Sequence, residues 1–154
     1  MIFLLAFGIG CIAGLRSMTA PAAVAWAAHL GWIHLDHSPL AFLGATWALV
    51  LFTIAALAEF VVDLLPQTPA RTAPGPLVAR AVTGGLCGGS LAIAGSASML
   101  VGMLLGAVGG IAGALIGYRA RTGLVRSLQV PDRVIAIPED ILAVILAVFF
   151  VSRA

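Results

Sequence analysis

Arg16 is the residue whose type and position most directly suggest chemistry. It stands near the middle of the first thirty residues, which are otherwise uncharged and mostly apolar. A guanidinium in the hydrocarbon of a bilayer costs at least about 2.5–3.5 kcal/mol and usually faces a protein interior or a wet cavity. Ser17 and Thr19 follow it, so the cluster could offer N–H and hydroxyl donors to an anionic group. Alternatively, Arg16 forms an internal bridge to Glu59 or Asp63 that locks helices together.

Glu59 and Asp63 form a second candidate group. They are four residues apart in the apolar stretch AEFVVDLLP, so a helix would place both carboxylates on one face. Unpaired carboxylates there would be costly, and we expect them to pair with an arginine or to hold a proton. The candidate partners are Arg16, Arg71, Arg80 and Arg119. A purely structural salt bridge to Arg80 or Arg71 is the alternative interpretation.

Glu139 and Asp140 form the third group, directly after Pro138. Proline is favoured at the first position of a helix, and acidic residues in the first turn are stabilised by the helix dipole. The pair therefore either caps a helix that begins near Pro138 or acts on the same solute as Glu59 and Asp63.

The composition indicates an integral membrane protein. Of the 154 residues, 62% are hydrophobic and 9% are charged, whereas about 25% of the residues of a soluble domain are charged. The net charge of +2 and the lack of a basic run argue against a nucleic-acid partner. We expect a single membrane domain over residues 1–154, surrounded by the lipid bilayer.

Hydropathy predicts an all-α helical bundle with about five membrane segments, each needing about 20 residues to span. The segments cover residues 2–30, 39–65, 76–96, 98–118 and 138–153. The first segment contains Arg16 and Pro21, so it is either one kinked helix or two helices separated by unwound backbone. The polar stretch 119–137 contains ARTGLVRSL, which we expect to form a short amphipathic helix at the interface.

Arginine positions predict the orientation. The connections 66–75 and 119–138 carry arginines, whereas the connection 29–38 carries none. The positive-inside rule places the arginine-bearing connections in the cytoplasm. With the first segment counted as one span, the N-terminus would be cytoplasmic and the C-terminus external, and the protein would lie in the inner membrane of a bacterium.

Small residues recur at four-residue spacing in the third and fourth segments. Such faces let helix backbones approach closely, either within one chain or between two copies. The residues that would form a homo-oligomer seam are Gly102, Gly106, Gly110, Gly113 and Gly117.

Two glycine-rich stretches lead into an arginine. GIGCIAGLR ends at Arg16 and GGIAGALIGYR ends at Arg119, and an apolar segment with carboxylates follows each. The two stretches are either an inverted repeat, as in small transporter folds, or chance similarity in sequence rich in Gly and Ala.

Catalytic and metal-binding signatures are missing from the sequence. It has no G-x-S-x-G, HExxH, P-loop or CxxC motif, so we expect no enzyme activity. His29, His34 and His37 resemble a metal-binding spacing only loosely, so we expect neither a metal nor a cofactor.

Several motifs together resemble a family of bacterial membrane proteins called domain of unknown function 4126. They are GLRSMTAP, AEFVVDLLP with its proline-rich loop and Arg80, GYRAR, and PEDILAVILA. The family pattern has a basic residue after the aspartate of AEFVVD, where this sequence has Leu64 and Leu65. The resemblance implies a multi-helix inner-membrane protein and implies no particular activity.

The predicted function is a small transporter or permease for a small anionic or polar solute. Arg16 would bind the anionic group, and carboxylates would carry a proton or balance the charge. The residues predicted to form this site are Arg16, Ser17, Thr19, Glu59, Asp63, Arg80, Arg119, Glu139 and Asp140. The alternative is a structural or assembly protein in which the charges join helices and the glycine faces bind a partner or a second copy.

Overall fold

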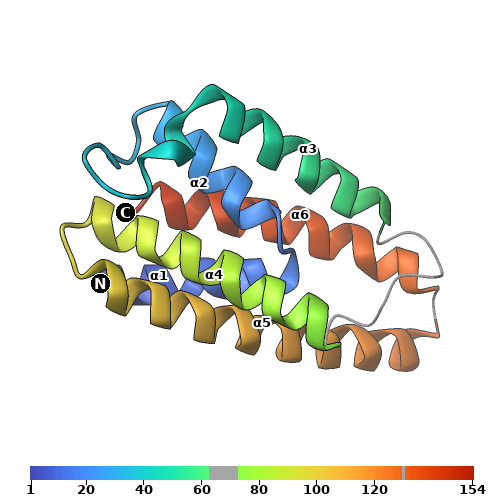
Figure 1. Ribbon diagram of the computed structural model, residues 1–154. Coiled ribbons are helices and arrows are strands. Elements are labelled where there is room, and N and C mark those ends of the chain that lie inside the picture. Colours follow the sequence, from blue (N-terminus) through green and yellow to red (C-terminus); the bar gives the residue numbers. More distant parts are fainter. Residues whose placement is uncertain (63–72, 130) are drawn as a thin grey trace.

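The computed structural model describes residues 1–62, 73–129 and 131–154, with every side chain in these ranges except those of Asp132 and Arg133. The described chain is helical, which confirms the all-α prediction (Figure 1). Its elements are α1 (Ile2–Leu15), α2 (Thr19–His29), the 3-10 helix η1 (Ala41–Gly44), α3 (Thr46–Val62), α4 (Pro74–Ala94), α5 (Met99–Leu128) and α6 (Asp132–Val151). Asp63 and Arg71 lie outside the described residues.

The helices have the length and surface of a membrane bundle. Among the described residues, α4, α5 and the Val134–Val151 part of α6 are long and apolar enough to cross a bilayer, and α1 and α3 are shorter apolar helices. Large apolar side chains are exposed along the outer faces of α3, α5 and α6, including Leu51, Ile54, Leu57, Leu100, Leu104, Val108, Ile141, Ile145 and Val148. Patches of this extent favour lipid over water as the surroundings.

The first apolar segment is broken rather than kinked. Helix α1 ends at Leu15, Arg16 is extended with φ −139° and ψ 109°, and α2 begins at Thr19. Pro21 lies in the first turn of α2, where a backbone N–H would have no partner within the helix, so the proline costs no hydrogen bond there. In one continuous helix, the same proline would remove a bond and clash with the preceding turn.

Helices α1 and α2 form a hairpin whose tip lies inside the bundle. Gly8 packs against Phe150, whereas Arg16 is paired with Asp140, so α1 runs opposite to α6. Helix α2 then runs back along α3, since Ser17 bonds Glu59 and Trp26 bonds Thr53. The chain therefore enters along α1 and leaves along α2 at the same end of the bundle (Figure 1).

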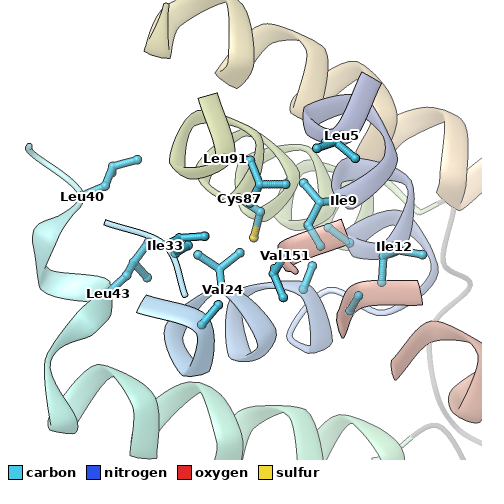
Figure 2. Close-up of a cluster of buried hydrophobic side chains, with 14 of the residues drawn as sticks. Leu5, Ile9, Ile12, Val24, Ile33, Leu40, Leu43, Cys87, Leu91 and Val151 are labelled. Carbon is cyan, nitrogen blue, oxygen red and sulfur yellow. The ribbon is translucent and has the colours of Figure 1, made fainter. Parts of the chain in front are cut away.

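A buried cluster at that end holds the hairpin against the other helices. It joins the first half of α1, the second half of α2 and the last turns of α4 and α6 through Leu5, Val24, Leu91 and Val151 (Figure 2). The sulfur of Cys87 lies among these side chains, and its thiol is free. Residues 1 and 154 lie at this end, so the expectation that they face opposite sides of the membrane is wrong (Figure 1). The reason is that residues 2–30 turn back within the bundle instead of crossing it.

Glycine contacts pack α1, α4 and α5 together with their backbones nearly touching. A Cβ at Gly106 would meet backbone atoms of Gly84 and Gly88 on α4, and one at Gly113 would meet those of Cys11 on α1. The predicted packing within one chain is thus confirmed. The residues expected in a seam between copies, Gly102, Gly106, Gly110, Gly113 and Gly117, are all buried within the single chain, so they offer no face to a second copy.

Of the two interpretations of the glycine-rich stretches, the inverted repeat does not agree with these contacts. Phe7 lies beside Gly109, and Cys11 lies beside Gly113, so α1 and α5 run in the same direction. An inverted repeat requires its two halves to run in opposite directions. The hairpin is the cause, because it adds a reversal of direction between α1 and α3.

Two predicted boundaries in the second half are also corrected. Helix α5 continues to Leu128, so the stretch expected to form a separate interfacial helix is its last part. Helix α6 begins at Asp132 and contains Pro138, so Glu139 and Asp140 lie near its middle and do not cap its start. At 1.5 Å per residue, α5 is about 45 Å long, which exceeds a hydrocarbon core of about 30 Å.

The fold predicts that both ends of the chain lie on one side of the membrane. The arginines of the last part of α5, Arg119, Arg121 and Arg126, lie at the opposite end of the bundle, which the positive-inside rule places in the cytoplasm. We expect topology reporters fused before Met1 and after Ala154 to report an external location, and a reporter inserted at Gln129 to report the cytoplasm. Opposite locations of the two ends would contradict the hairpin.

The glycine packing predicts that an added methyl group lowers stability at a buried glycine and not at an exposed one. Gly106→Ala should destabilise the protein by about 1–3 kcal/mol, because the new Cβ meets fixed backbone. Gly123→Ala is the matched control: a Cβ there meets nothing within 4 Å, and alanine favours a helix by about 1 kcal/mol. Thermal unfolding in detergent micelles measures both, and equal midpoints would contradict the packing.

Candidate functional site

The break between α1 and α2 places Arg16 at the centre of the site. Its side chain is fully buried and forms an ion pair with Asp140 of α6, whose side chain is 19% exposed. The guanidinium also lies over the ring of Phe60 on α3, 5.5 Å from the ring centroid, a cation–π geometry. The expected internal partner was Glu59 or Asp63, and the observed partner in the described residues is the carboxylate of α6.

Glu59 instead accepts the backbone donors that the helix break exposes. Its Oε1 accepts hydrogen bonds from the Ser17 backbone N–H at 2.8 Å and the Ser17 hydroxyl at 2.7 Å. Its Oε2 accepts one from the Met18 N–H at 2.9 Å. These donors directly precede α2, where the helix dipole stabilises a negative charge. Glu59 lies near the end of α3, and its carboxylate accepts hydrogen bonds from the residues just before α2.

Arg80 plays the complementary part at the end of α1. Its buried Nη1 donates to the Gly14 carbonyl oxygen at 2.6 Å and to the Leu15 carbonyl oxygen at 3.2 Å. Carbonyl groups at the end of a helix lack partners within that helix, and the dipole there favours a positive charge. Arg80 and Glu59 therefore do not form the bridge that was one of the expected alternatives. Arg80 contacts the end of α1, and Glu59 contacts the residues before α2.

The first lateral groove reaches the break along α2. It has a volume of about 400 Å³, with α2 as its floor and α3 and α6 as its walls. Apart from Thr19 and Thr53, its lining is made of apolar and aromatic side chains, from Trp26 at the terminal end to Phe60 at the break. A smaller hollow of about 270 Å³ continues from Phe60 to Asp140. The groove and the hollow share Phe60 and Val144, and Asp140 lines the hollow and not the groove.

Thr19 lies at the inner end of this groove. Its hydroxyl oxygen is buried and has no hydrogen-bond partner in the part of the chain that the structure describes. The side chain of Thr53, by contrast, donates to the Leu49 carbonyl and accepts from the Trp26 indole N–H. Buried hydroxyls are normally bonded, so the Thr19 oxygen calls for an explanation.

A second lateral groove lies on the opposite side of α6. It has a volume of about 470 Å³ and is lined by α5, α6 and the end of α1. Glu139 lines it and pairs with Arg121, with Nη1 and Oε2 3.3 Å apart and both side chains nearly buried. Successive residues of a helix point about 100° apart, so Glu139 lines the second groove while its neighbour Asp140 lines the smaller hollow.

The structure gathers most of the predicted site residues at the helix break. Ser17, Thr19, Glu59, Arg80 and Asp140 all lie there with Arg16. Glu139 is placed in the second groove, and Arg119 is exposed on α5. Arg121 is not among the residues that the sequence predicts for the site. The signal that favours it over Arg119 is the helical continuation of α5, which fixes the faces on which the two arginines lie.

The histidines are placed at the terminal end of the bundle. His34 and His37 are exposed in the connection that precedes η1. The Nδ1 atom of His29 is 3.1 Å from the Gly44 carbonyl oxygen. Among the described residues, no group of three His, Cys, Asp or Glu side chains is arranged to hold a metal ion.

Comparison with family models identifies the family of this chain. The family model described as "Domain of unknown function (DUF4126)" matches residues 3–152. The chain belongs to this family. The match covers nearly the whole chain, including the hairpin and α6, so the ion pair and both grooves lie within the family domain. Searches of curated proteins and of solved structures returned no match.

The role of Glu59 predicts a large loss of stability on its removal. Glu59→Ala leaves the N–H groups of Ser17 and Met18 without their acceptor, and hydrogen bonds to a charged group contribute about 1.5–3 kcal/mol each. We expect a loss of at least that size in detergent unfolding experiments. Asp36→Asn, which changes an exposed carboxylate in the connection before η1, is the control and should leave stability unchanged within about 0.5 kcal/mol.

Proposed function

We propose that this protein is a small transporter of the bacterial inner membrane that binds an anionic or polar solute at Arg16. The observation that supports the proposal is the position of the Arg16–Asp140 pair at the tip of a hairpin that ends inside the bundle. Transporters commonly bind their substrates near the bilayer midplane, where discontinuous helices expose charged ends and backbone groups. Ionisable residues at that depth are rare and usually functional.

The two grooves support access to the pair from two sides. The first groove runs from the end that carries the termini to Phe60, and Asp140 lines the smaller hollow next to Phe60. The second reaches Leu15, beside Arg16, from the opposite side of α6 and extends towards the arginine-bearing end. A rocking movement of α6 against the hairpin would open one groove while closing the other, which is the geometric requirement of alternating access.

Asp140 provides the exchange step of the proposed mechanism. Among the described residues, Arg16 pairs with Asp140 at the break, and Arg121 pairs with Glu139 across α6. An anion that binds Arg16 must replace Asp140, because a second negative charge beside it would be repelled. A proton on Asp140 would remove the repulsion, so anion binding and proton uptake would be linked.

A structural role is the second candidate, supported by the way the ion pairs join helices. Arg16–Asp140 joins the hairpin to α6, and Arg121–Glu139 joins α5 to α6. In this candidate, the charges only fix the positions of the helices. Any oligomer would then use a surface other than the buried glycine faces.

The transport proposal predicts that both members of the pair are needed. In proteoliposomes, Arg16→Gln and Asp140→Asn should each lower the uptake of acetate and of inorganic phosphate. The loss should be about tenfold or more, since a charge-assisted hydrogen bond contributes about 1.5–3 kcal/mol and 1.4 kcal/mol is a factor of ten. Arg126→Gln, an exposed arginine on α5, is the matched control and should retain uptake.

The paired variant Arg16→Met with Asp140→Leu separates the two candidates. Replacing a buried ion pair by apolar residues is often neutral or stabilising, whereas losing one partner costs about 3–5 kcal/mol. A transporter with this double substitution should fold and fail to transport. Wild-type uptake by the folded double variant would refute the transport role and leave the structural one.

A further inference from the structure

The occupant of the first groove can be inferred from its two ends. Along α2, from Thr19 to Leu30, the groove is about 16 Å long at 1.5 Å per residue. Its volume of about 400 Å³ lies within the range of about 300–1,000 Å³ of ligand pockets. Its walls are exposed towards the surroundings at Leu57 and Val148. In a bilayer, an apolar groove with such rims faces acyl chains and not water.

The inner end of the groove is polar, unlike its apolar walls. The Thr19 hydroxyl is buried there without a partner in the described part of the chain, and it can donate or accept one hydrogen bond from a ligand. Thr19 is only 5% exposed and lies three residues from Arg16, with Phe60 lining the groove beside it. The ring of Phe60 also contacts the Arg16 guanidinium. The apolar groove thus ends at a buried hydroxyl and at the ring of Phe60, and the Arg16 guanidinium lies over that ring.

We propose that the first groove binds a membrane amphiphile with an apolar chain and a carboxylate or phosphate head. The chain lies along α2 between α3 and α6, and the head bonds Thr19 and reaches Arg16 when Asp140 is protonated. This inference rests on the proposed function and names the class of its substrate. A free inorganic anion matches the head site, but it leaves the apolar length of the groove without a role.

Tryptophan quenching tests the proposal at equilibrium. Trp26 lines the groove, so the variant Trp32→Phe, Trp47→Phe keeps one reporter in it. The protein is placed in phosphatidylcholine vesicles that contain dibromostearate, its neutral methyl ester, or phosphatidic acid with dibrominated chains. We expect an anionic probe to quench Trp26 at a several-fold lower mole fraction than the methyl ester. A preference for dibromostearate or for phosphatidic acid identifies the head as carboxylate or phosphate. Equal quenching by all three probes would overturn the proposal.

Substitutions at the inner end connect the preference to the proposed site. Thr19→Val removes the hydroxyl at nearly constant volume and should abolish the preference, as should Arg16→Gln. Thr122→Val on α5 is the matched control and should retain it, because its hydroxyl bonds the Tyr118 carbonyl outside the groove. A preference that persists in both Thr19→Val and Arg16→Gln would refute the site.

A variant that fills the groove tests the proposal even if the Thr19 and Arg16 variants do not fold. Ala23→Leu adds volume on the floor of the groove, away from the charges, and should weaken quenching by the anionic probes. Unchanged quenching in a folded Ala23→Leu protein would also overturn the proposal. The readout is binding alone, so it is separate from transport. Loss of the preference with retained acetate uptake removes only the amphiphile, whereas a clear preference without any uptake removes only the transport function.

Discussion

The requirement that a broken helix satisfy its backbone hydrogen bonds within a membrane governs this structure. Unwound backbone at such depth survives only where protein covers it, and no water is at hand to bond the free groups. Glu59 accepts the N–H groups before α2, and Arg80 donates to the carbonyl groups at the end of α1. Each charge also matches the dipole of the helix end that it meets. The hairpin can therefore end inside the bundle.

The position of Arg16 follows from the hairpin. Its extended backbone leaves α1 and directs the side chain between α3 and α6, where Phe60 and Asp140 receive it. A buried guanidinium without a counter-charge would be strongly unfavourable. Asp140 is partly exposed and lines the small hollow next to the first groove, whereas Arg16 is fully buried. The partial exposure of Asp140 is the feature on which the proposed function depends.

Glycine packing explains how so short a chain encloses such a site. Helices α1, α4 and α5 approach until their backbones touch, because the facing positions carry no side chains. This three-helix unit occupies little volume and is rigid, since interior packing is dense. Helices α2, α3 and α6 pack with larger gaps, and both grooves border on α6. The molecule thus combines a tightly packed half with a half that contains both grooves.

The sequence by itself determined the membrane class, the glycine packing and the need of Arg16 for a buried partner. Apolar composition and four-residue spacing are local properties, and a lone charge in an apolar stretch is unfavourable in any arrangement. Only the tertiary structure decided which described carboxylate pairs with Arg16, that α1 and α2 turn back, and that Glu139 and Asp140 pair with different arginines. Such pairings join residues far apart in the chain. They depend on the direction in which each helix runs, and the reversal at Arg16 changes that direction without leaving a periodic signal in the sequence.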